Sequence, residues 1–556
     1  MNSTQKSIPF VGLHAHSTFS TFDGFGFPAE HMERAYEHGM DALALTDHGN
    51  MNGLSYQILH AQKMKAEGKN FKPIFGIEAY FIPSITDWRE QYEEAKLDKK
   101  RSKTLEKEGS SGAIVNEEEA GKVDKKSLNR RRHLVLLAAN QKGLENLYTM
   151  ISKSYSGDYF YRKPRIDWEL LKKHQEGVIV ATACLGGIAA GSMWKHQEDG
   201  EDAIVEDMLA NLTKFRDTFG DRFYTELQWN NIPEQHLLNK CLIKVAQQLD
   251  IKLISTCDSH YPSPEAWRDR EVYKRLGWLG KMPAWMDADI PDSVEEIGYE
   301  LYPKNASQMW DEYKKSYEHY AFYKDSEELV RDSIERTHDI TWNECEDTWI
   351  DTRPKLPKVD APNKSAFKQL AELVMEGLKR EGLDDKPEYV ERAKYELSDI
   401  KYLKCASYFI TMYKVFCLAK EKTLLGAGRG SGAGSLVNYL LGITQIDPLP
   451  YGLLWSRFLG RHRVSFPDID TDAGDRDVLI DAARQLFGDD AVIPVSNFNT
   501  LKLKSLVKDI AKIYSVPFEE VNEMTGPLQD EVMPLARDDD QEKSVFVLKH
   551  EDCMKY

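Results

Sequence analysis

Short apolar runs alternate with amphipathic stretches through the first half of this 556-residue chain. The stretches between the runs show helical spacing, as in Glu30–His38, which Gly39 ends, and in Glu234–Leu249. The predicted strands are Val11–His16, Ala42–Asp47, Pro73–Phe81, His133–Ala139, Gly177–Cys184, Phe223–Gln228 and Lys252–His260. Seven strand–helix units in series favour a parallel β/α barrel, with an open doubly wound sheet as the alternative.

This pattern is interrupted and then replaced. Residues 92–130 are rich in Lys, Glu, Gly and Ser, and they predict a solvated insertion or flexible excursion. After His260, tryptophan and tyrosine become frequent among long polar helices up to Asp351. Pro354, Pro357 and Pro362 then indicate a linker.

The last third of the chain is predicted to begin with two helices. Phe367, Leu370, Leu373, Val374 and Leu378 share one face of the first, and the second runs from about Glu388 to Ile400. A glycine-rich loop, an extended segment at Pro467–Asp472 and a lysine-bearing helical stretch from Thr500 follow. The predicted domains are 1–262, a connecting region 263–363, a third domain 364–499 and the start of a fourth at 500–556.

Composition narrows the class of protein. Charged residues make up 29% and hydrophobic residues 41%, which is typical of a multidomain globular chain. No window approaches twenty apolar residues and the N-terminus lacks an apolar signal core, so we expect no membrane span and a cytoplasmic location. Seven cysteines without a C-x-x-C pair argue against disulfides. The net charge of −17 argues against diffuse nucleic-acid binding but permits a locally basic groove.

Metal-ligand side chains gather where the predicted strands end, which in a parallel barrel is one mouth. They are His14, His16, Asp23, His48, Glu78, His133, Cys184, Asp258 and His260. His133 is the exception, because it begins its predicted strand. Nine ligands suit two or three divalent ions, with zinc and manganese both reasonable, and such ions can activate water for phosphoester hydrolysis. The alternative is that each residue is an ordinary polar group.

A second candidate site lies near the C-terminus. Gly426–Ser435 is a glycine-rich loop that phosphates could approach closely. In Pro467–Asp472 the carboxylates alternate, so Asp468 and Asp470 project from one face of an extended segment and could share divalent ions. A phosphate-binding loop beside two aspartates is suited to nucleotidyl transfer with two metal ions.

Five short motifs resemble those of the PHP (polymerase and histidinol phosphatase) domain. They are His14-Ala15-His16, Thr46-Asp47-His48-Gly49, Gly76-Ile77-Glu78, Ala183-Cys184 and Asp258-Ser259-His260. The resemblance implies a seven-stranded β/α barrel, metal-dependent phosphoester hydrolysis and, in polymerases, a 3′–5′ exonuclease. All ligand positions of the family carry a plausible ligand here, so we expect a competent site.

A longer series of blocks is similar to the C-family replicative DNA polymerases of the alpha-subunit type. In order they are Glu391-Arg392, Tyr395-Glu396-Leu397, Tyr408-Phe409-Ile410, Gly428 to Val437, Leu441 to Thr444, Ile446 to Leu449, Arg457-Phe458-Leu459, Arg463-Val464-Ser465 and Pro467 to Asp470. The resemblance implies an α/β multidomain chain. A PHP-type (β/α)7 barrel would be followed by an α+β, nucleotidyltransferase-like palm and the start of a helical thumb.

The resemblance also implies roles for particular residues. Asp468 and Asp470 would hold two Mg²⁺ ions, and Arg429, Gly430, Ser431 and Arg463 would bind the incoming dNTP. Lys504 and Lys508 would contact the backbone of primer–template DNA, with a solvated helix face as the alternative.

The sequence also departs from the family pattern. Ala473 follows Asp472 where the family usually has Asp-x-Asp-x-Asp-Phe, and the family's third catalytic aspartate has no counterpart before Tyr556. We therefore expect a second polypeptide to supply the rest of the palm, the fingers and the sliding-clamp contact, because the gene is split, interrupted or truncated. A bacterial or phage-infected host would suit this reading. The alternatives are a free-standing PHP phosphoesterase with a vestigial palm and a non-catalytic replication component.

Overall fold

The computed structural model describes residues 8–107, 128–281, 290–294, 296–348, 350–351, 364–462, 466–493, 495, 497–498 and 502–527, and the side chains of 98–107 and Lys504 are excluded. The chain forms two compact units, Met1–Trp349 with Leu501–Tyr556, and Ile350–Thr500. Over the described residues, no helix is long and apolar enough to cross a membrane.

A seven-stranded curled sheet forms the centre of the first unit. Its strands are β1 (Ala42–Leu45), β2 (Lys72–Ile82), β3 (Arg132–Ala138), β6 (Ile166–Asp167), β7 (Val178–Ala181), β8 (Phe223–Leu227) and β9 (Lys252–Ser255). The order is β1-β2-β3-β7-β8-β9, with β6 paired to β2. Strand β3 runs antiparallel to both β2 and β7, whereas the other pairs are parallel. The expectation of an all-parallel barrel is therefore wrong for one strand. A separate pair, β4 (Phe160–Tyr161) and β5 (Lys163–Pro164), forms a small hairpin.

The predicted first strand, Val11–His16, closes the sheet through single bridges instead of a regular ladder. Gly12 bridges Leu43 of β1, and Ala15 bridges Ser259, just beyond β9. Backbone hydrogen bonds from Thr46 N to Ala15 O and from His16 N to Ser259 O hold this segment to both edges of the sheet. His14 and His16 are thereby fixed in the interior by backbone contacts.

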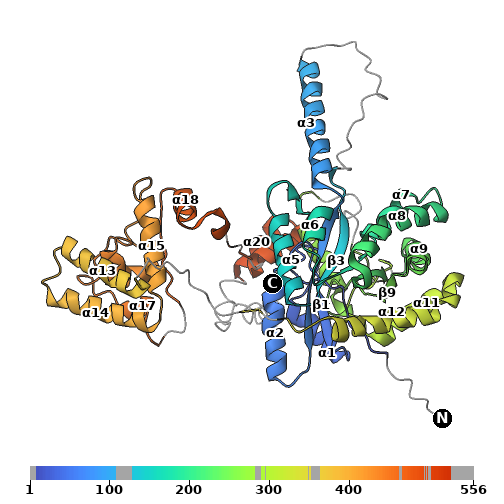
Figure 1. Cartoon of the computed structure of the whole chain (residues 1–556), viewed down its shortest axis with the longest axis horizontal. Helices are drawn as coiled ribbons and strands as arrows, with labels where there is room; N and C mark the ends of the chain where they lie inside the picture. The colour runs from blue at the N-terminus through green and yellow to red at the C-terminus, as the bar shows by residue number, and fades with distance from the viewer. Residues whose placement is uncertain are drawn as a thin grey trace. The chain divides into compact units, whose positions relative to one another are not determined.

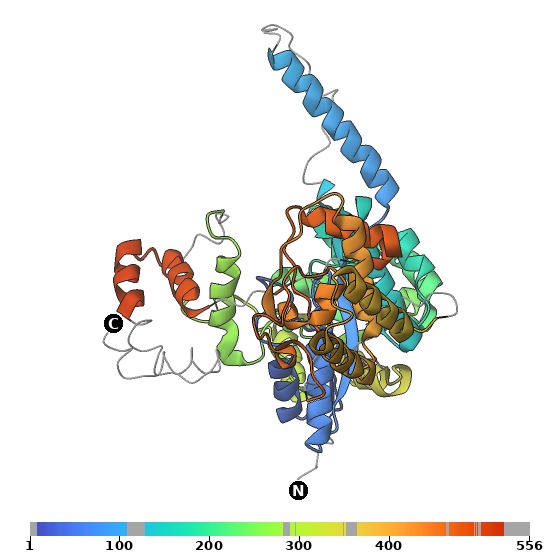
Figure 2. The same ribbon diagram turned by 90° about the vertical axis from the view of Figure 1, so that its left-hand side faces the viewer.

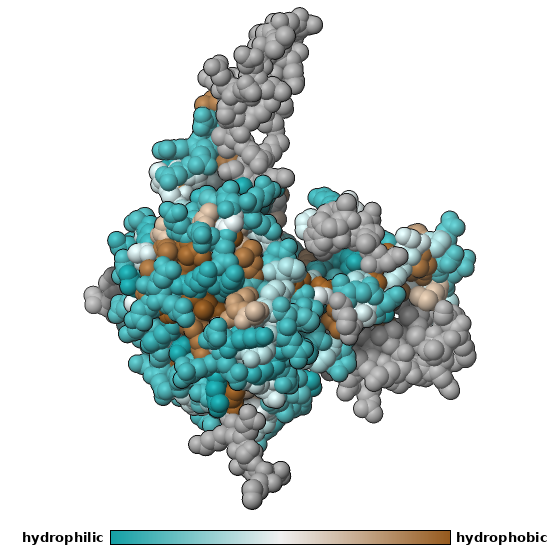
Figure 3. Space-filling model, turned by 90° about the vertical axis from the view of Figure 1, so that its right-hand side faces the viewer, coloured by the Kyte–Doolittle hydropathy of each residue, from teal (hydrophilic) through white to brown (hydrophobic). Residues whose placement is uncertain are grey.

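Amphipathic helices surround the sheet (Figure 1). They are α1 (Pro28–Glu37), α2 (Leu54–Ala66), α5 (Gln141–Ser154), α6 (Trp168–Lys173), α7 (Ile188–Lys195), α8 (Glu201–Phe219), α9 (Pro233–Leu249), α10 (Trp267–Leu276), α11 (Ala306–His319) and α12 (Glu327–Asp339). Inside the sheet, Val11, Ala44, Val135, Ile179 and Ile254 belong to one buried cluster. The face of this unit in Figure 3 is largely hydrophilic, with apolar residues in separate patches, as expected when helices turn their apolar sides inward.

Helix α3 (Ile85–Lys107) extends away from the sheet as one long helix (Figures 1 and 2). The first part of the predicted insertion is therefore helical, which agrees with its many Glu and Lys residues, because these are strong helix formers. Residues 108–127 of the insertion lie outside the described residues.

Helices beyond residue 260 also pack on the sheet. Thr337 of α12 accepts a hydrogen bond from Val11 N (3.0 Å), and Lys72 Nζ donates to Thr341 O (3.0 Å). The helix pair α19 (Leu503–Ile513) and α20 (Phe518–Pro527) belongs to this unit as well. The three prolines of the predicted linker lie outside the described residues.

The second unit is helical over its described residues. Its helices are α13 (Ala366–Arg380), α14 (Pro387–Tyr402), α15 (Ala406–Ala419), α16 (Leu436–Leu440), α17 (Trp455–Phe458) and α18 (Arg476–Phe487), with a 3₁₀ turn at Gly430–Gly434. The first two confirm the predicted helices, and Leu370, Val374 and Leu378 are buried as their spacing indicated.

The expected strand at Pro467–Asp472 has no β-ladder. The β pairing described in this unit is a single bridge, Leu425 to Ala473, and Ile469 N bonds the Tyr408 hydroxyl (3.1 Å). A strand needs a neighbouring strand to accept its N–H groups, and here a tyrosine takes that role at one position.

Candidate functional site

The nine side chains predicted as ligands converge on one mouth of the curled sheet. His14 and His16 come from the closing segment, Glu78 from β2, and Asp258 and His260 from the loop after β9. His133 reaches the same mouth because β3 is reversed, so the start of that strand lies beside the ends of its neighbours. Its position at a strand start, which is anomalous for a parallel barrel, is therefore explained by strand direction.

Three overlapping triads make up the cluster. They are His14–His16–Asp258, His16–His48–His260 and His48–Glu78–His133, and within each triad the ligand atoms lie within 4.8 Å of one another. Cys184 Sγ lies 3.6 Å from Glu78 Oε1, and Asp23 Oδ2 lies 3.2 Å from His48 Nε2. This sharing of histidines between triads is the pattern expected of a multinuclear site.

Glu78 lies between two halves of the cluster. Its Oε1 is 2.9 Å from His133 Nδ1 and 3.4 Å from His14 Nε2, and its Oε2 is 2.6 Å from His48 Nδ1. A carboxylate whose two oxygens face different histidines can bridge two cations.

Several of the buried ligand atoms have no hydrogen-bond partner. They are His14 Nε2, His16 Nε2, His48 Nδ1, Glu78 Oε2 and Asp258 Oδ1. Leaving a buried polar atom unpaired costs about 1–3 kcal/mol. Five such atoms in one pocket therefore fit a site whose lone pairs are meant for cations.

The electrostatics of the cluster are strongly mutual. Burial alone would lower the pKa of His14, but Asp258, Glu226 and Glu78 outweigh burial and raise it well above the usual value. Burial would raise the pKa of Glu78, but the neighbouring His133, His48 and His14 hold it well below the usual value. Burial raises the pKa of the Cys184 thiol, and the nearby carboxylates add to this effect. Glu78 is therefore ionised, as a metal ligand must be.

Sequence reasoning missed the residues that orient the ligands. Buried Glu226 accepts hydrogen bonds from His14 Nδ1 (2.9 Å), Ala183 N (2.9 Å) and Thr256 Oγ1 (2.7 Å). The one available signal was a glutamate inside a predicted buried strand, where an unpaired carboxylate is not tolerated.

Asp23 is held by an arginine outside the predicted PHP boundaries. Arg270 of α10 donates from Nη2 to Asp23 Oδ1 (2.6 Å) and from Nε to Asp23 O (2.8 Å). No local pattern pairs two residues so far apart in the sequence.

Backbone strain also occurs at the cluster. Ala183 and Asp258 have φ values of 60° and 48°, a left-handed conformation that is costly for residues other than glycine. Such strain concentrates where the surrounding structure must fix a side chain, here Asp258 itself and Cys184 next to Ala183.

The second candidate site keeps the alternation predicted for Pro467–Asp472. Pro467 and Ile469 are buried, whereas Asp468, Asp470 and Asp472 are exposed. The two proposed catalytic carboxylates therefore share one solvent-facing side. Among the described residues, the groups of three ligand atoms within 4.8 Å all lie in the histidine cluster, so these aspartates do not form such a group.

The glycine-rich loop lies directly against the aspartates. A Cβ on Gly430 would fall 2.2 Å from Asp470 Oδ2, and Gly430 has a φ of +60°. Arg429 Nη1 donates to Asp472 Oδ1 (2.8 Å), an exposed ion pair of small energetic value. Glycine at position 430 is thus required both by backbone conformation and by the close approach of Asp470.

Buried Glu396 of α14 anchors the end of this loop. Its carboxylate accepts hydrogen bonds from Ser435 Oγ, Leu436 N and Val437 N, each at 3.0 Å, and from Arg392 Nε (2.7 Å). Arg392 also donates to Gly434 O (2.9 Å). The loop is therefore fixed to α14 by a buried, fully paired carboxylate.

The remaining predicted residues are placed as follows. Arg463 and the side chain of Lys504 lie outside the described residues. Ser431 is half-buried in the 3₁₀ turn. Lys508 of α19 hydrogen-bonds Asn522 Oδ1 and lies 5.2 Å from the Phe518 ring centroid, so part of its role is to join α19 to α20.

Two family models match the chain in agreement with these two sites. The PHP domain matches residues 12–230, and the bacterial DNA polymerase III alpha NTPase domain matches residues 368–553. The chain is a homologue of the bacterial DNA polymerase III alpha subunits. It is 34% identical over 530 residues to DNA polymerase III subunit alpha of Aquifex aeolicus, a match that covers 93% of this chain and 41% of the relative.

Other alpha subunits match over a similar range. Those of Borreliella burgdorferi and Thermus aquaticus are 33% and 29% identical, with 94% and 93% of this chain covered. The chain spans about two fifths of the length of these relatives, with 40% and 42% of them covered.

Solved structures resemble this chain only loosely. A putative metal-dependent phosphoesterase from Bifidobacterium adolescentis matches at 16% identity and a TM-score of 0.23, over 45% of this chain and 88% of its own. An amidohydrolase from Chromobacterium violaceum with bound sulfate matches at 14% identity and a TM-score of 0.25, over 47% of this chain and 96% of its own.

Proposed function

We propose that this chain is the part of a replicative DNA polymerase alpha subunit that carries a metal-dependent 3′–5′ exonuclease site in its PHP domain. The observation that supports the nuclease is the convergence of nine ligand-type side chains on one mouth, with five buried ligand atoms left without hydrogen-bond partners. The polymerase assignment rests on homology to the alpha subunits.

The nine residues would hold two or three divalent ions, with zinc and manganese both suited to this mixture of ligands. When bound, such ions activate a water molecule and stabilise negative charge on a phosphodiester undergoing hydrolysis. Glu226 accepts the Nδ1 proton of His14, which leaves the Nε2 lone pair of His14 facing the cluster. Arg270 holds Asp23 in the same way, by two hydrogen bonds.

The reaction would remove the last nucleotide of a strand. Water adds to the terminal phosphodiester phosphorus, and the bond to the 3′-oxygen of the preceding nucleotide breaks. The products are a nucleoside 5′-monophosphate and a strand one nucleotide shorter with a free 3′-hydroxyl.

The test uses a 5′-labelled single-stranded oligodeoxynucleotide with Mn²⁺ or Zn²⁺. The purified chain should produce a ladder that shortens from the 3′ end, and His14→Ala should abolish it, since His14 contacts both Glu78 and Asp258. His196→Ala, at an exposed ion pair on Asp199, is the matched control and should retain activity. Full activity of His14→Ala after metal stripping and reloading would mean that the cluster is structural.

A second activity, nucleotidyl transfer, is favoured by the exposed pair Asp468 and Asp470 beside the glycine-rich loop. These aspartates would hold Mg²⁺, and Arg429, Gly430, Ser431 and Arg463 would bind the triphosphate of a dNTP. Primer–template DNA would be the other substrate, with Lys504 and Lys508 near its backbone. Protein outside this chain would complete the palm and contact the sliding clamp.

The separation of the two sites can be tested on protein purified from its native source with whatever accompanies it. Asp468→Ala should abolish nucleotide incorporation and leave the exonuclease intact, because the two sites belong to different units. Equal loss of both activities would contradict two separate sites.

A further inference from the structure

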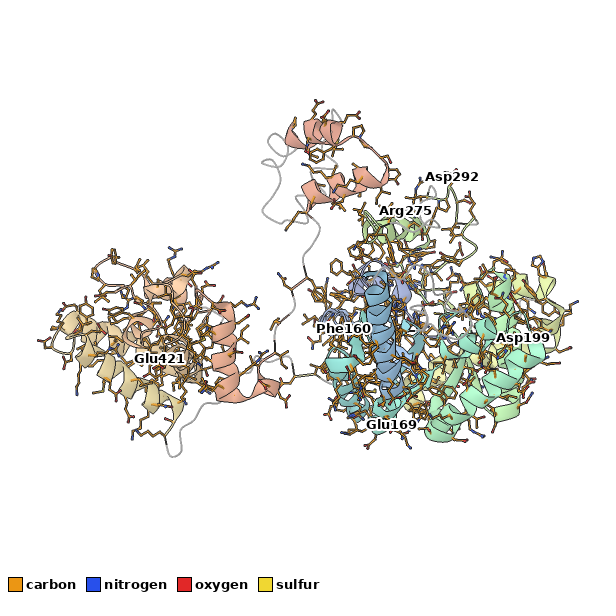
Figure 4. The ribbon with its side chains drawn as sticks, turned by 90° about the horizontal axis from the view of Figure 1, so that it is seen from above. Phe160, Glu169, Asp199, Arg275, Asp292 and Glu421 are labelled. Atoms are coloured by element: carbon orange, nitrogen blue, oxygen red, sulfur yellow. The ribbon has the colours of Figure 1, made fainter. Side chains whose placement is uncertain are left out.

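A hollow of about 550 Å³ adjoins the metal cluster and shares Asp23, His48 and His133 with it. Six of its lining residues carry the argument, and we name this surface the trough: Phe22, Tyr80, Arg131, Tyr155, Lys163 and Trp278. In Figure 4, the labelled Phe160 lies near one wall, since Phe160 stacks on Tyr155 at 5.9 Å, and the labelled Arg275 ends α10 near the other.

The first feature of the trough is its positive charge. Arg131, Lys163 and Lys274 line it, and its one carboxylate, Asp23, is paired with Arg270. Lys274 is paired with Glu271 (2.9 Å), whereas Arg131 and Lys163 have no ion pair among the described residues. Arg131 Nε is buried without a hydrogen-bond partner. A chain with a net charge of −17 thus has cations available for an anion beside its metal cluster.

The ring of Tyr80 positions these cations. Arg131 Cζ lies 5.0 Å and Lys163 Nζ 5.6 Å from its centroid. The same ring stacks on His48 at 5.8 Å and meets His133 edge-on at 5.4 Å. One buried tyrosine therefore separates two cations from two metal-ligand histidines, so an anion held by the cations would lie next to the cluster.

The second feature is a set of exposed aromatic faces. Phe22, Tyr155 and Trp278 are 40%, 49% and 44% exposed, which is high for such large side chains. Phe22 has a φ of 61° and packs on Tyr273 at a ring distance of 5.3 Å. A Cβ on Gly277 would fall 2.5 Å from Phe22, so the backbone of Gly277 supports this ring closely. A strained, supported and exposed phenyl ring is a rigid stacking surface.

We infer that the trough binds the unpaired end of a DNA strand, with Arg131 and Lys163 on its phosphates and Phe22, Tyr155 and Trp278 stacked on its bases. Cations interleaved with aromatic faces are how proteins bind single strands, because every base offers a flat face and every nucleotide a phosphate. Paired bases already stack within a duplex and cannot use these faces. The inference rests on the proposed nuclease function and adds to it a substrate subsite and a preference for unpaired ends.

Binding can be measured without hydrolysis. In EDTA, the fluorescence anisotropy of a labelled oligothymidylate gives the Kd for the whole chain. We expect Arg131→Gln combined with Lys163→Gln to weaken binding about tenfold and to make it less salt-dependent. We expect Phe22→Ala and Trp278→Ala each to weaken it about tenfold. Phe22→Tyr keeps the ring and should bind like wild type, which separates loss of stacking from misfolding.

Matched controls lie outside the trough. Lys172→Gln removes an exposed cation of α6, and Trp194→Ala removes an indole that is 41% exposed on α7. Neither change should alter the Kd. A blunt duplex of the same sequence should compete at least tenfold more weakly than the single strand. Equal binding by trough and control variants, or equal competition by the duplex, would overturn the inference.

Hydrolysis separates this inference from the function on which it rests. With Mn²⁺, bis(4-nitrophenyl) phosphate is too small to span the trough, so trough variants should hydrolyse it at the wild-type rate. On the oligonucleotide their KM should rise about tenfold while kcat changes little. Wild-type protein that cleaves only the small ester would refute the exonuclease, whereas an unchanged oligonucleotide KM in the trough variants would refute the trough alone.

Discussion

Replacing Glu226 by glutamine tests whether the residues behind the ligands control the metal centre. The carboxylate of Glu226 accepts at both oxygens: Oε1 from Ala183 N, and Oε2 from His14 Nδ1 and Thr256 Oγ1. A glutamine has only one accepting oxygen. If its amide nitrogen faces Ala183, two N–H groups oppose each other at a fixed backbone position.

If the amide nitrogen faces His14 instead, Nδ1 must become an acceptor. The ring then carries its proton on Nε2, the atom that lies 3.4 Å from Glu78 and 3.1 Å from Asp258 in the cluster. That proton removes the lone pair a cation needs. Changes in such supporting residues typically lower metal affinity about 10- to 100-fold, which equals about 1.4 to 2.7 kcal/mol of binding free energy.

The assay is titration of metal-free protein with Mn²⁺ and with Zn²⁺ by isothermal calorimetry. Thermal unfolding with and without metal gives a second readout, because bound metal stabilises the folded state. Glu169→Gln makes the same chemical change at an exposed site on α6 and should leave both readouts unchanged. Wild-type affinity in Glu226→Gln, with its metal-free stability also intact, would refute the argument that Glu226 fixes the His14 tautomer.

Three further predictions concern stability and can be checked by urea unfolding of the chain. Gly430→Ala should cost about 1–2 kcal/mol for its left-handed backbone and more for the clash with Asp470; Gly442→Ala, at φ +70° with no atom nearby, isolates the backbone part, and equal losses would deny the clash. Glu396→Ala should destabilise the second unit by about 3 kcal/mol, since it strands a buried arginine and two backbone N–H groups, and an unchanged midpoint would contradict this. Burial lowers the pKa of His236 to about 4, so the unfolded chain binds the proton more tightly; stability should fall between pH 6.5 and 4, by about 3 kcal/mol at most, and His236→Gln should flatten this slope.

Much of the candidate site could be predicted from local sequence. The apolar runs marked most strands within a few residues, and ligand-type residues at their ends marked the cluster, because strand ends that share a sheet edge must meet. The alternation in Pro467–Asp472 likewise predicted which carboxylates would share a face, and this holds even though the segment joins no ladder. Periodicity reports the burial of side chains, and burial is what these short segments encode.

Strand direction could not be predicted in the same way. A run such as Leu134–Ala138 is equally apolar in a parallel or an antiparallel strand, so the reversal of β3 depends on its neighbours β2 and β7. That reversal is what brings His133 to the cluster. Glu226, Arg270 and the trough were also missed, since each depends on partners more than a hundred residues away or on the shape of a surface.

The sequence by itself determined which chemical groups this protein carries and which of them face inward, because both follow from residue type and short-range spacing. Only the tertiary structure decided which groups act together. Hydrogen bonds such as Glu226 to His14, the pairing of Arg270 with Asp23 and the packing of Phe22 on Gly277 are formed between distant segments, and their geometry exists only once the sheet has closed.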